Sequence, residues 1–308
     1  TLWHAHIAKF LSGMARGQAA VVGLDLVLPQ RSYEQVMPGS DRALMRGILE
    51  ARRAYPLVLG ITIDPAGKPR QVYPPFITAA GEGASAFVLL RTDRDGVVRR
   101  FDEHQTLDGG EIPTLAGQMA RRLGITPGNG FIDYSRGANF NYVPLYSVLE
   151  RVDNGDTEWL RANFAGKAVM LGGVLKFEDI QRLPVALTTW IDDEGATPGV
   201  LMHAQALRSI LGNHLIKEAD AWLIALAAAV ATLLWFGAVN TTAALAMVSV
   251  TTFGLLVIST WLLPQGIFFP VVEVFGAASL AAFGRVGLNT AEKLLERRRM
   301  RLAFSGYV

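Results

Sequence analysis

Three long apolar runs follow one another near the end of the chain. They occupy residues 221–239, 241–263 and 267–285, and each approaches the ~20 apolar residues that a helix needs to cross a bilayer. The connections between them are very short, and backbone inside lipid must be helical because no water satisfies its amides. The pattern therefore predicts an all-α bundle of three transmembrane helices within residues 218–285.

A basic segment follows the third run. Residues 286–308 contain Arg297, Arg298, Arg299 and Arg301, and the positive-inside rule places such a cluster in the cytoplasm. Three crossings then place residues 1–217 on the opposite side of the membrane. Anionic lipid headgroups explain the cluster better than nucleic acid does. Membrane lipids are therefore a predicted partner, and no nucleic acid is expected.

The first 217 residues alternate between strand-like and helix-like patterns. Nearly continuous apolar runs, typical of buried parallel strands, lie at residues 19–28, 57–63, 84–90 and 168–171. Amphipathic helical spacing lies at residues 3–14, 41–54, 112–123, 158–164 and 200–211. This alternation predicts an α/β domain with a mainly parallel sheet.

One antiparallel feature is expected beside that sheet. Apolar residues 87–90 and the segment 97–101 flank a polar stretch that ends in Asp95-Gly96. Asp-Gly favours the tight turn of a β-hairpin. We therefore predict a hairpin over residues 87–101.

Composition agrees with this division. The chain has 308 residues, of which 51% are hydrophobic, and its mean hydropathy is +0.28. It contains no cysteine, so an exported domain would be stable without disulfides, as its size permits. The net charge of +2 does not identify a partner.

The chain carries no phosphate-binding loop, no nucleophile elbow and no zinc-binding helix motif. We therefore expect no catalytic residue, metal or cofactor within it. The acidic residues 192–194 lack the ligand spacing of a calcium loop and are interpreted as a solvated turn.

A candidate ligand site lies at the strand ends. Asp25 ends an apolar strand, where open parallel sheets place their binding crevices; alternatively it accepts amides of the following turn. His203 follows Pro198 at the start of a helix and is either a pH-sensitive group or a buried, hydrogen-bonded histidine. Gly172 and Gly173 after a strand permit close approach of a ligand, or form only a tight turn.

Four further residues are candidates for signal transfer. Glu273 lies in the third apolar run, where a carboxylate is costly; it either reaches the headgroups or takes part in helix pairing. Leu288, Leu295 and Leu302 recur every seven residues among charged residues. This spacing is consistent with the seam of a short parallel dimeric coiled coil.

Four segments, in this order and followed by membrane helices, resemble a known family. They are residues 21–28, 93–100, 166–173 and 198–207. The family is the type-two CHASE sensor domain (cyclase/histidine-kinase-associated sensory extracellular). The resemblance implies an extracytoplasmic sensor for an unknown stimulus in the bacterial inner membrane. Such domains begin with a membrane anchor and a first strand, which we expect to precede Thr1.

Residues 296–308 further resemble the junction with a class III adenylate or guanylate cyclase domain. The resemblance implies that this cyclase lies beyond Val308 and that it uses Mg²⁺ or Mn²⁺. It also implies that the active sites form between two protomers, so that the chain is a homodimer. Two alternatives remain open: a noncatalytic accessory or structural subunit of a membrane complex, and the sensor of a histidine kinase.

Overall fold

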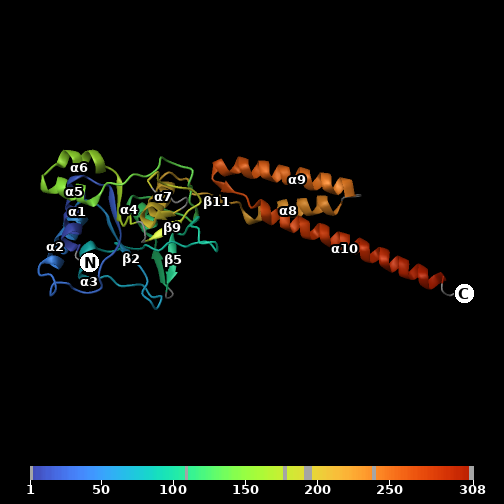
Figure 1. Cartoon of the computed structure of the whole chain (residues 1–308), viewed down its shortest axis with the longest axis horizontal. Helices are drawn as coiled ribbons and strands as arrows, with labels where there is room; N and C mark the ends of the chain where they lie inside the picture. Colours follow the sequence, from blue (N-terminus) through green and yellow to red (C-terminus); the bar gives the residue numbers. More distant parts are fainter. Residues whose placement is uncertain (1–2, 108–109, 176–178, 191–195, 238–240, 305–308) are drawn as a thin grey trace. The chain divides into compact units, whose positions relative to one another are not determined.

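The chain divides into two compact units, residues 1–215 and residues 216–308. The computed structural model describes residues 3–107, 110–175, 179–190, 196–237 and 241–304. Figure 1 shows the strands of the first unit and the long helices of the second.

A parallel four-stranded sheet forms the centre of the first unit. It consists of β1 (Val21–Val27), β2 (Leu57–Ile61), β3 (Ser85–Phe87) and β8 (Ala168–Gly172). Their spatial order is β3-β2-β1-β8, and every neighbouring pair is parallel. This confirms the α/β class and the parallel sheet predicted from the apolar runs.

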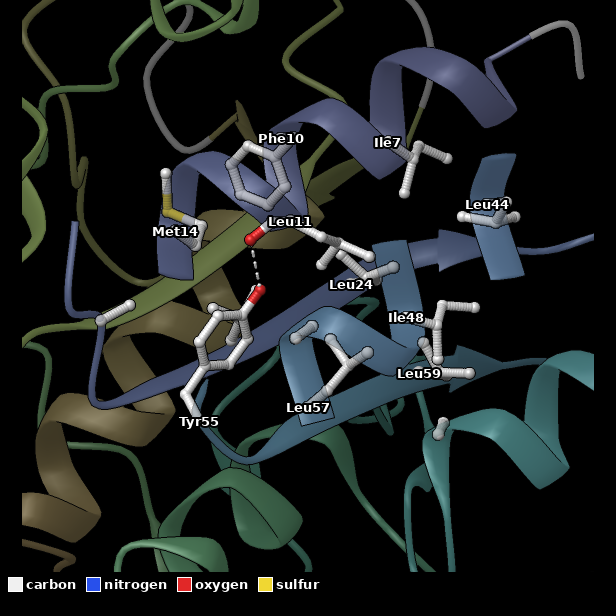
Figure 2. Close-up of a cluster of buried hydrophobic side chains, with 14 of the residues drawn as sticks. Ile7, Phe10, Leu11, Met14, Leu24, Leu44, Ile48, Tyr55, Leu57 and Leu59 are labelled. Atoms are coloured by element: carbon white, nitrogen blue, oxygen red, sulfur yellow. Dashed lines mark hydrogen bonds between the residues drawn. The ribbon is translucent and has the colours of Figure 1, made fainter. Parts of the chain in front are cut away.

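Five helices cover one face of this sheet: α1 (His4–Arg16), α2 (Ser40–Ala54), α3 (Pro74–Ala80), α5 (Leu145–Asp153) and α6 (Thr157–Phe164). Alternate strand residues point to this side, as the two-residue period of a strand requires; Leu24, Leu57 and Leu59 are among them. Figure 2 shows this core, in which the Tyr55 hydroxyl donates to the carbonyl oxygen of Leu11 at 2.9 Å.

The intervening strand residues face a second core under α4 (Leu115–Arg122) and α7 (Gly199–Leu211). Val21 and Val58 belong to it, and Met202 contributes from α7. Gly23 permits the close approach of α4, because a Cβ at this position would collide with the side chain of Met119. The first unit is therefore a three-layer α/β/α arrangement with a packed core on each face of the sheet.

The predicted hairpin over residues 87–101 is wrong, although its turn forms. Gly96 has φ of 78°, and its amide donates to the carbonyl oxygen of Asp93. The Asp93 amide also donates to the carbonyl oxygen of Val97 at 2.9 Å. Beyond this turn the two arms take other partners: β3 pairs with β2, and Val97 bridges to Arg182. The other short strands that the structure describes in the first unit form antiparallel pairs. These are β4 (Arg100–Phe101) with β7 (Gly130–Phe131), β5 (His104–Leu107) with β6 (Gly110–Pro113), and β9 (Ile180–Arg182) with β10 (Ala196–Pro198).

The second unit is mainly helical. It contains α8 (Ala221–Phe236), α9 (Thr241–Leu262), the short 3-10 helix η1 (Leu263–Gln265) and α10 (Val271–Phe304). The strands β11 (Lys217–Glu218) and β12 (Ile267–Phe268) pair in parallel at one end of the unit. A small apolar core joins the helices through residues such as Ala231, Val274 and Ala278.

Two segments of the described chain are long and apolar enough to cross a membrane, Ala246–Gln265 and Val271–Leu302. Helix α8 has 16 residues, or about 24 Å, against a hydrocarbon core of about 30 Å. The apolar C-terminal part is therefore confirmed, whereas the third crossing stays a prediction. The third apolar run was predicted to be helical from residue 267. In the structure residues 267–268 form β12, and the helix begins at Val271.

Candidate functional site

The carboxyl ends of β1 and β8 bring three of the predicted site residues together. Asp25 on β1 is paired with Gly172 on β8. His203 on α7 approaches from the helical layer, with its Nε2 atom 3.8 Å from Oδ1 of Asp25. The side chains of Asp25 and His203 are 6% and 2% exposed, so both are covered from solvent.

The hydrogen bonding of His203 assigns one of its ring protons. Nε2 lies 2.8 Å from the carbonyl oxygen of Val88. A carbonyl oxygen can only accept, so Nε2 carries a hydrogen and donates it there. The 3.8 Å approach to Asp25 is too long for a hydrogen bond; it is an electrostatic contact. Nδ1 of His203 and Oδ2 of Asp25 have no hydrogen-bond partner among the described residues.

The two glycines differ in their surroundings. A Cβ at Gly172 would lie 2.6 Å from Cβ of Val200 and 3.1 Å from Oδ2 of Asp25. Glycine at 172 therefore lets the start of α7 pack against the end of β8. Gly173 is exposed and has open space where a Cβ would lie. It lies outside the buried contact between Asp25 and His203, and its role in the approach of a ligand stays a prediction.

Asp179 completes the electrostatic surroundings. Its backbone carbonyl accepts the amide of Gly199 at 2.9 Å, at the first residue of α7. Burial raises the pKa of Asp25, the nearby His203 lowers it in part, and the Asp179 carboxylate raises it further. Asp25 is therefore a buried carboxyl group beside His203, and its ionisation places a charge where solvent does not reach it.

This geometry predicts a pH dependence of stability. Folding raises the pKa of Asp25, so the folded state favours the protonated side chain. The contribution of Asp25 to the free energy of unfolding is therefore fully present below the unfolded pKa of about 3.9. It is lost as the pH rises through the folded pKa. In the Asp25→Asn variant this side chain is neutral at every pH. The stability of the variant relative to the native chain should therefore increase as the pH rises from the unfolded pKa to the folded pKa. Urea unfolding at several pH values measures this.

A suitable control is Glu111→Gln, which removes an exposed carboxylate from β6. A stability difference between Asp25→Asn and the native chain that does not change with pH would contradict the burial argument.

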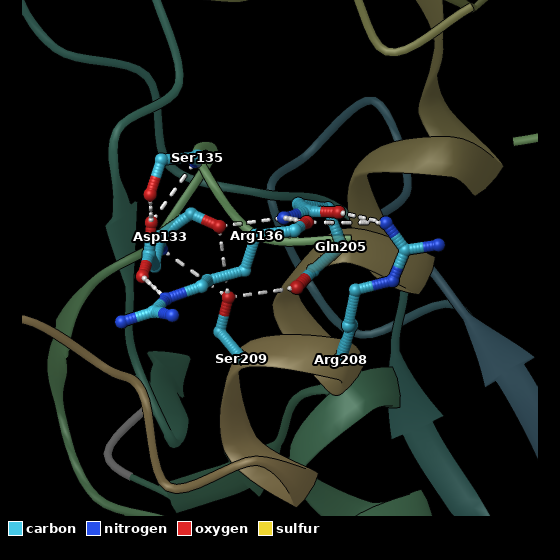
Figure 3. A network of polar contacts seen from close by, with 6 residues as sticks. All are labelled: Asp133, Ser135, Arg136, Gln205, Arg208 and Ser209. Atoms are coloured by element: carbon cyan, nitrogen blue, oxygen red, sulfur yellow. Dashed lines mark hydrogen bonds and ion pairs between the residues drawn. The ribbon is translucent and has the colours of Figure 1, made fainter. Parts of the chain in front are cut away.

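The opposite side of α7 is held by a hydrogen-bonded network (Figure 3), whose members are Asp133, Ser135, Arg136, Gln205, Arg208 and Ser209. Nε2 of Gln205 donates to the carbonyl oxygen of Asp133 at 2.5 Å, and the Arg208 guanidinium lies 3.7 Å from the ring centre of Phe140. Such a satisfied network fixes the position of the helix. The orientation of His203 is thus set from both sides of α7.

Sequence reasoning missed a second buried histidine–aspartate pair. Nδ1 of His4, at the start of α1, lies 3.4 Å from Oδ1 of Asp41 on α2. Oδ2 of Asp41 accepts the Ser32 hydroxyl at 2.6 Å and the Tyr33 amide at 3.0 Å. Burial lowers the pKa of His4, and Asp41 raises it in part. No local motif signals this pair, because its members lie on different helices.

The signal-transfer candidates all lie on α10. Glu273 is exposed in the first turn of this helix, where the helix dipole stabilises an acidic side chain. Leu288, Leu295 and Leu302 are 59%, 55% and 67% exposed. More than half of each side chain in this seven-residue repeat is thus exposed in the described structure.

Among the described residues, no group of three or more acidic, histidine or cysteine side chains is arranged to hold a metal ion. The acidic residues 192–194, interpreted above as a solvated turn, lie outside the described residues.

Comparison with known proteins identifies the family. The CHASE2 domain matches residues 2–253, which is most of the chain. No curated protein and no solved structure matches it. The matched segment includes the sheet, the Asp25–His203 pair, α7 and the first apolar helix of the second unit. Two candidate membrane helices fit a membrane protein. The chain therefore belongs to the CHASE2 family of extracytoplasmic sensor domains found in signalling proteins.

Proposed function

We propose that this chain is the transmembrane sensor and signal-transducing module of a bacterial adenylate or guanylate cyclase. In this proposal it lies in the inner membrane, with the first unit outside the cytoplasm. It regulates cyclic-nucleotide synthesis by an output domain beyond Val308. Any Mg²⁺ or Mn²⁺ would be bound by that domain.

The observation that carries the proposal is the continuity of α10. This helix has 34 residues, or about 51 Å. A hydrocarbon core of about 30 Å leaves about 20 Å of helix outside the bilayer. With the membrane segment starting at Val271, the projecting part begins at about residue 291. It contains the basic residues at 297–301 with Leu295 and Leu302, and no helix break separates them from the membrane segment. A movement of the membrane segment is therefore transmitted directly to whatever follows.

The exposed leucines support a homodimer. Successive leucines of the repeat at 288, 295 and 302 are offset by about 20° around a straight helix, so these mostly exposed side chains share one face. A second helix packed against that face would bury them. A parallel partner from a second copy would place two output domains side by side. This matches the requirement of a cyclase for two protomers.

The stimulus is proposed to act at the sheet end around Asp25, Gly172, Gly173 and His203. Helix α7 carries His203 and is the last helix before the chain enters the second unit at residue 216. A change in charge or packing at the Asp25–His203 pair would thus act on the segment that leads to the membrane. Asp25→Ala and His203→Ala should alter the response to stimulus while leaving membrane insertion intact.

We further propose that α8 crosses the bilayer together with α9 and α10. Its ~24 Å length is short by about 6 Å, a mismatch that local thinning of the bilayer accommodates. Three crossings then place the first unit and the end of α10 on opposite sides. The basic residues at 297–301 favour the cytoplasm for the latter.

Cysteine labelling tests this topology, because the chain has no cysteine of its own. Tyr146 is 72% exposed in the first unit, and Arg299 lies in the exposed part of α10. In intact cells, Tyr146→Cys should react with a membrane-impermeant maleimide, whereas Arg299→Cys should react only after permeabilisation. Reaction at both sites in intact cells, or the reverse pattern, would exclude three crossings in this orientation.

Measurement of the output tests the function itself. Membranes from cells that express the complete natural protein should convert ATP or GTP into a cyclic nucleotide in the presence of Mg²⁺ or Mn²⁺. Phosphorylation of a histidine would instead indicate a kinase output. Absence of both activities, together with co-purification of a membrane complex, would support the accessory subunit.

A further inference from the structure

An apolar groove runs between α8 and α9 within the second unit. Its volume is about 810 Å³, within the range of about 300–1,000 Å³ typical of ligand sites. The walls are formed by aliphatic and small side chains of the two helices, including Leu223, Ala227, Leu234, Gly254 and Ile258. It exists because α8 packs more extensively against α10 than against α9.

One end of the groove is charged. Lys217, Glu218 and Asp220 line it there, and none of them forms an ion pair with another described residue. This end lies at the β11–β12 pair, where the chain enters the second unit from the extracytoplasmic first unit. The charged end therefore belongs at the outer surface of the bilayer.

The length of the groove distinguishes between its potential occupants. The lining residues of α8 extend from Leu223 to Leu234, about 17 Å along the helix axis, and those of α9 from Val250 to Leu262, about 18 Å. One leaflet contributes about 15 Å of the ~30 Å hydrocarbon core. A membrane-spanning helix of a partner would need contact over the full thickness, whereas one lipid chain needs only its own leaflet.

The charged end also selects a headgroup. The ammonium group of Lys217 is complementary in charge to a phosphate. The carboxylates of Glu218 and Asp220 are complementary in charge to an ammonium group. The net charge of these three side chains is negative, which disfavours a headgroup whose only charge is a phosphate. We propose that the α8–α9 groove binds the acyl chain of one outer-leaflet phospholipid, and that its charged end selects a zwitterionic headgroup with a primary amine. This proposal requires the membrane location but not a cyclase output.

Native mass spectrometry of the full chain in mild detergent tests the proposal. The probes are phosphatidylethanolamine and phosphatidylglycerol with identical acyl chains, added in equal amounts. We expect one bound phosphatidylethanolamine, preferred by about tenfold. Equal retention of both lipids would overturn the headgroup selection, and retention of neither would overturn the site.

Matched variants locate the lipid. Gly254 lines the groove and has open space where a Cβ would lie, so Gly254→Leu places a side chain in the groove. Gly276 on α10 also has open space but does not line the groove, so Gly276→Leu is the control. Gly254→Leu should lower lipid occupancy by about tenfold, and Gly276→Leu should not change it. The double variant Glu218→Gln/Asp220→Asn should keep a bound lipid but lose the preference.

Two results would count against the lipid. Unchanged binding in Gly254→Leu would show that the lipid lies elsewhere. Loss of a dimer in Gly254→Leu but not in Gly276→Leu would assign the groove to a second copy of the chain. If Gly254→Leu does not fold by circular dichroism, Val250→Phe serves the same purpose, because Val250 lines the groove and is 73% exposed.

Discussion

Replacement of Gly47 by alanine is expected to lower the free energy of unfolding of the first unit by about 2 kcal/mol. Gly47 lies on α2 where this helix crosses α1, and a Cβ there would be 2.7 Å from Cα of Ala8. Carbon atoms in van der Waals contact lie about 3.5–4.0 Å apart. The two helices would therefore have to separate.

Two effects of opposite sign compete in this variant. Alanine is favoured over glycine within a helix by about 1 kcal/mol. Separation of the helices loosens the core beneath them, where Leu11 and Ile48 are buried (Figure 2), and overpacking of this kind costs about 1–3 kcal/mol. We expect the packing cost to be larger, since the clash is with backbone.

Pulse proteolysis after urea denaturation measures this change in the first unit. Arg46→Ala alters the adjacent, exposed position on the same helix and should change stability by less than about 0.5 kcal/mol. Addition of Ala8→Gly removes the contact with Cβ of Ala8 but leaves those with its backbone, so recovery should be partial. A Gly47→Ala variant as stable as the native chain would show that helix propensity prevails.

Insertion of a single residue after Leu288 is expected to disrupt signalling in the complete protein. Helix α10 continues through this position, so one extra residue rotates everything after it by about 100°. Leu295 and Leu302 would then leave the face that carries Leu288. Cyclic-nucleotide production and its response to stimulus should change by about tenfold, within the range of typical coupling free energies.

A seven-residue insertion at the same position is the matched control. It lengthens the helix more but restores its phase to within about 20°, so activity should be largely preserved. Activities measured in membranes at equal expression compare the two variants. Equal activity and equal stimulus dependence in both would show that α10 is a passive tether, and the accessory-subunit alternative would gain support.

Much of the candidate site followed from one sequence-based argument. Asp25 and Gly172 were predicted at strand ends, and parallel strands end at the same edge of a sheet. The structure confirms that they are adjacent. The acceptor of His203 was not predictable, because Val88 contributes a backbone carbonyl and no side chain reveals it. Whether the cluster receives a stimulus stays a prediction.

The sequence by itself determined the four strands of the parallel sheet, the helices α1, α2, α4, α6 and α7 of the first unit, and the apolar character of the second unit. Helices α3 and α5 and the short antiparallel strands were not predicted. The predicted features depend on the hydrophobic pattern of neighbouring residues, which is local information. Only the tertiary structure decided the strand order and the partners of residues 87–101. Long-range hydrogen bonding and packing outweighed the Asp95-Gly96 turn signal there. The same holds for the His4–Asp41 pair and the α8–α9 groove, because the packing of distant elements creates both.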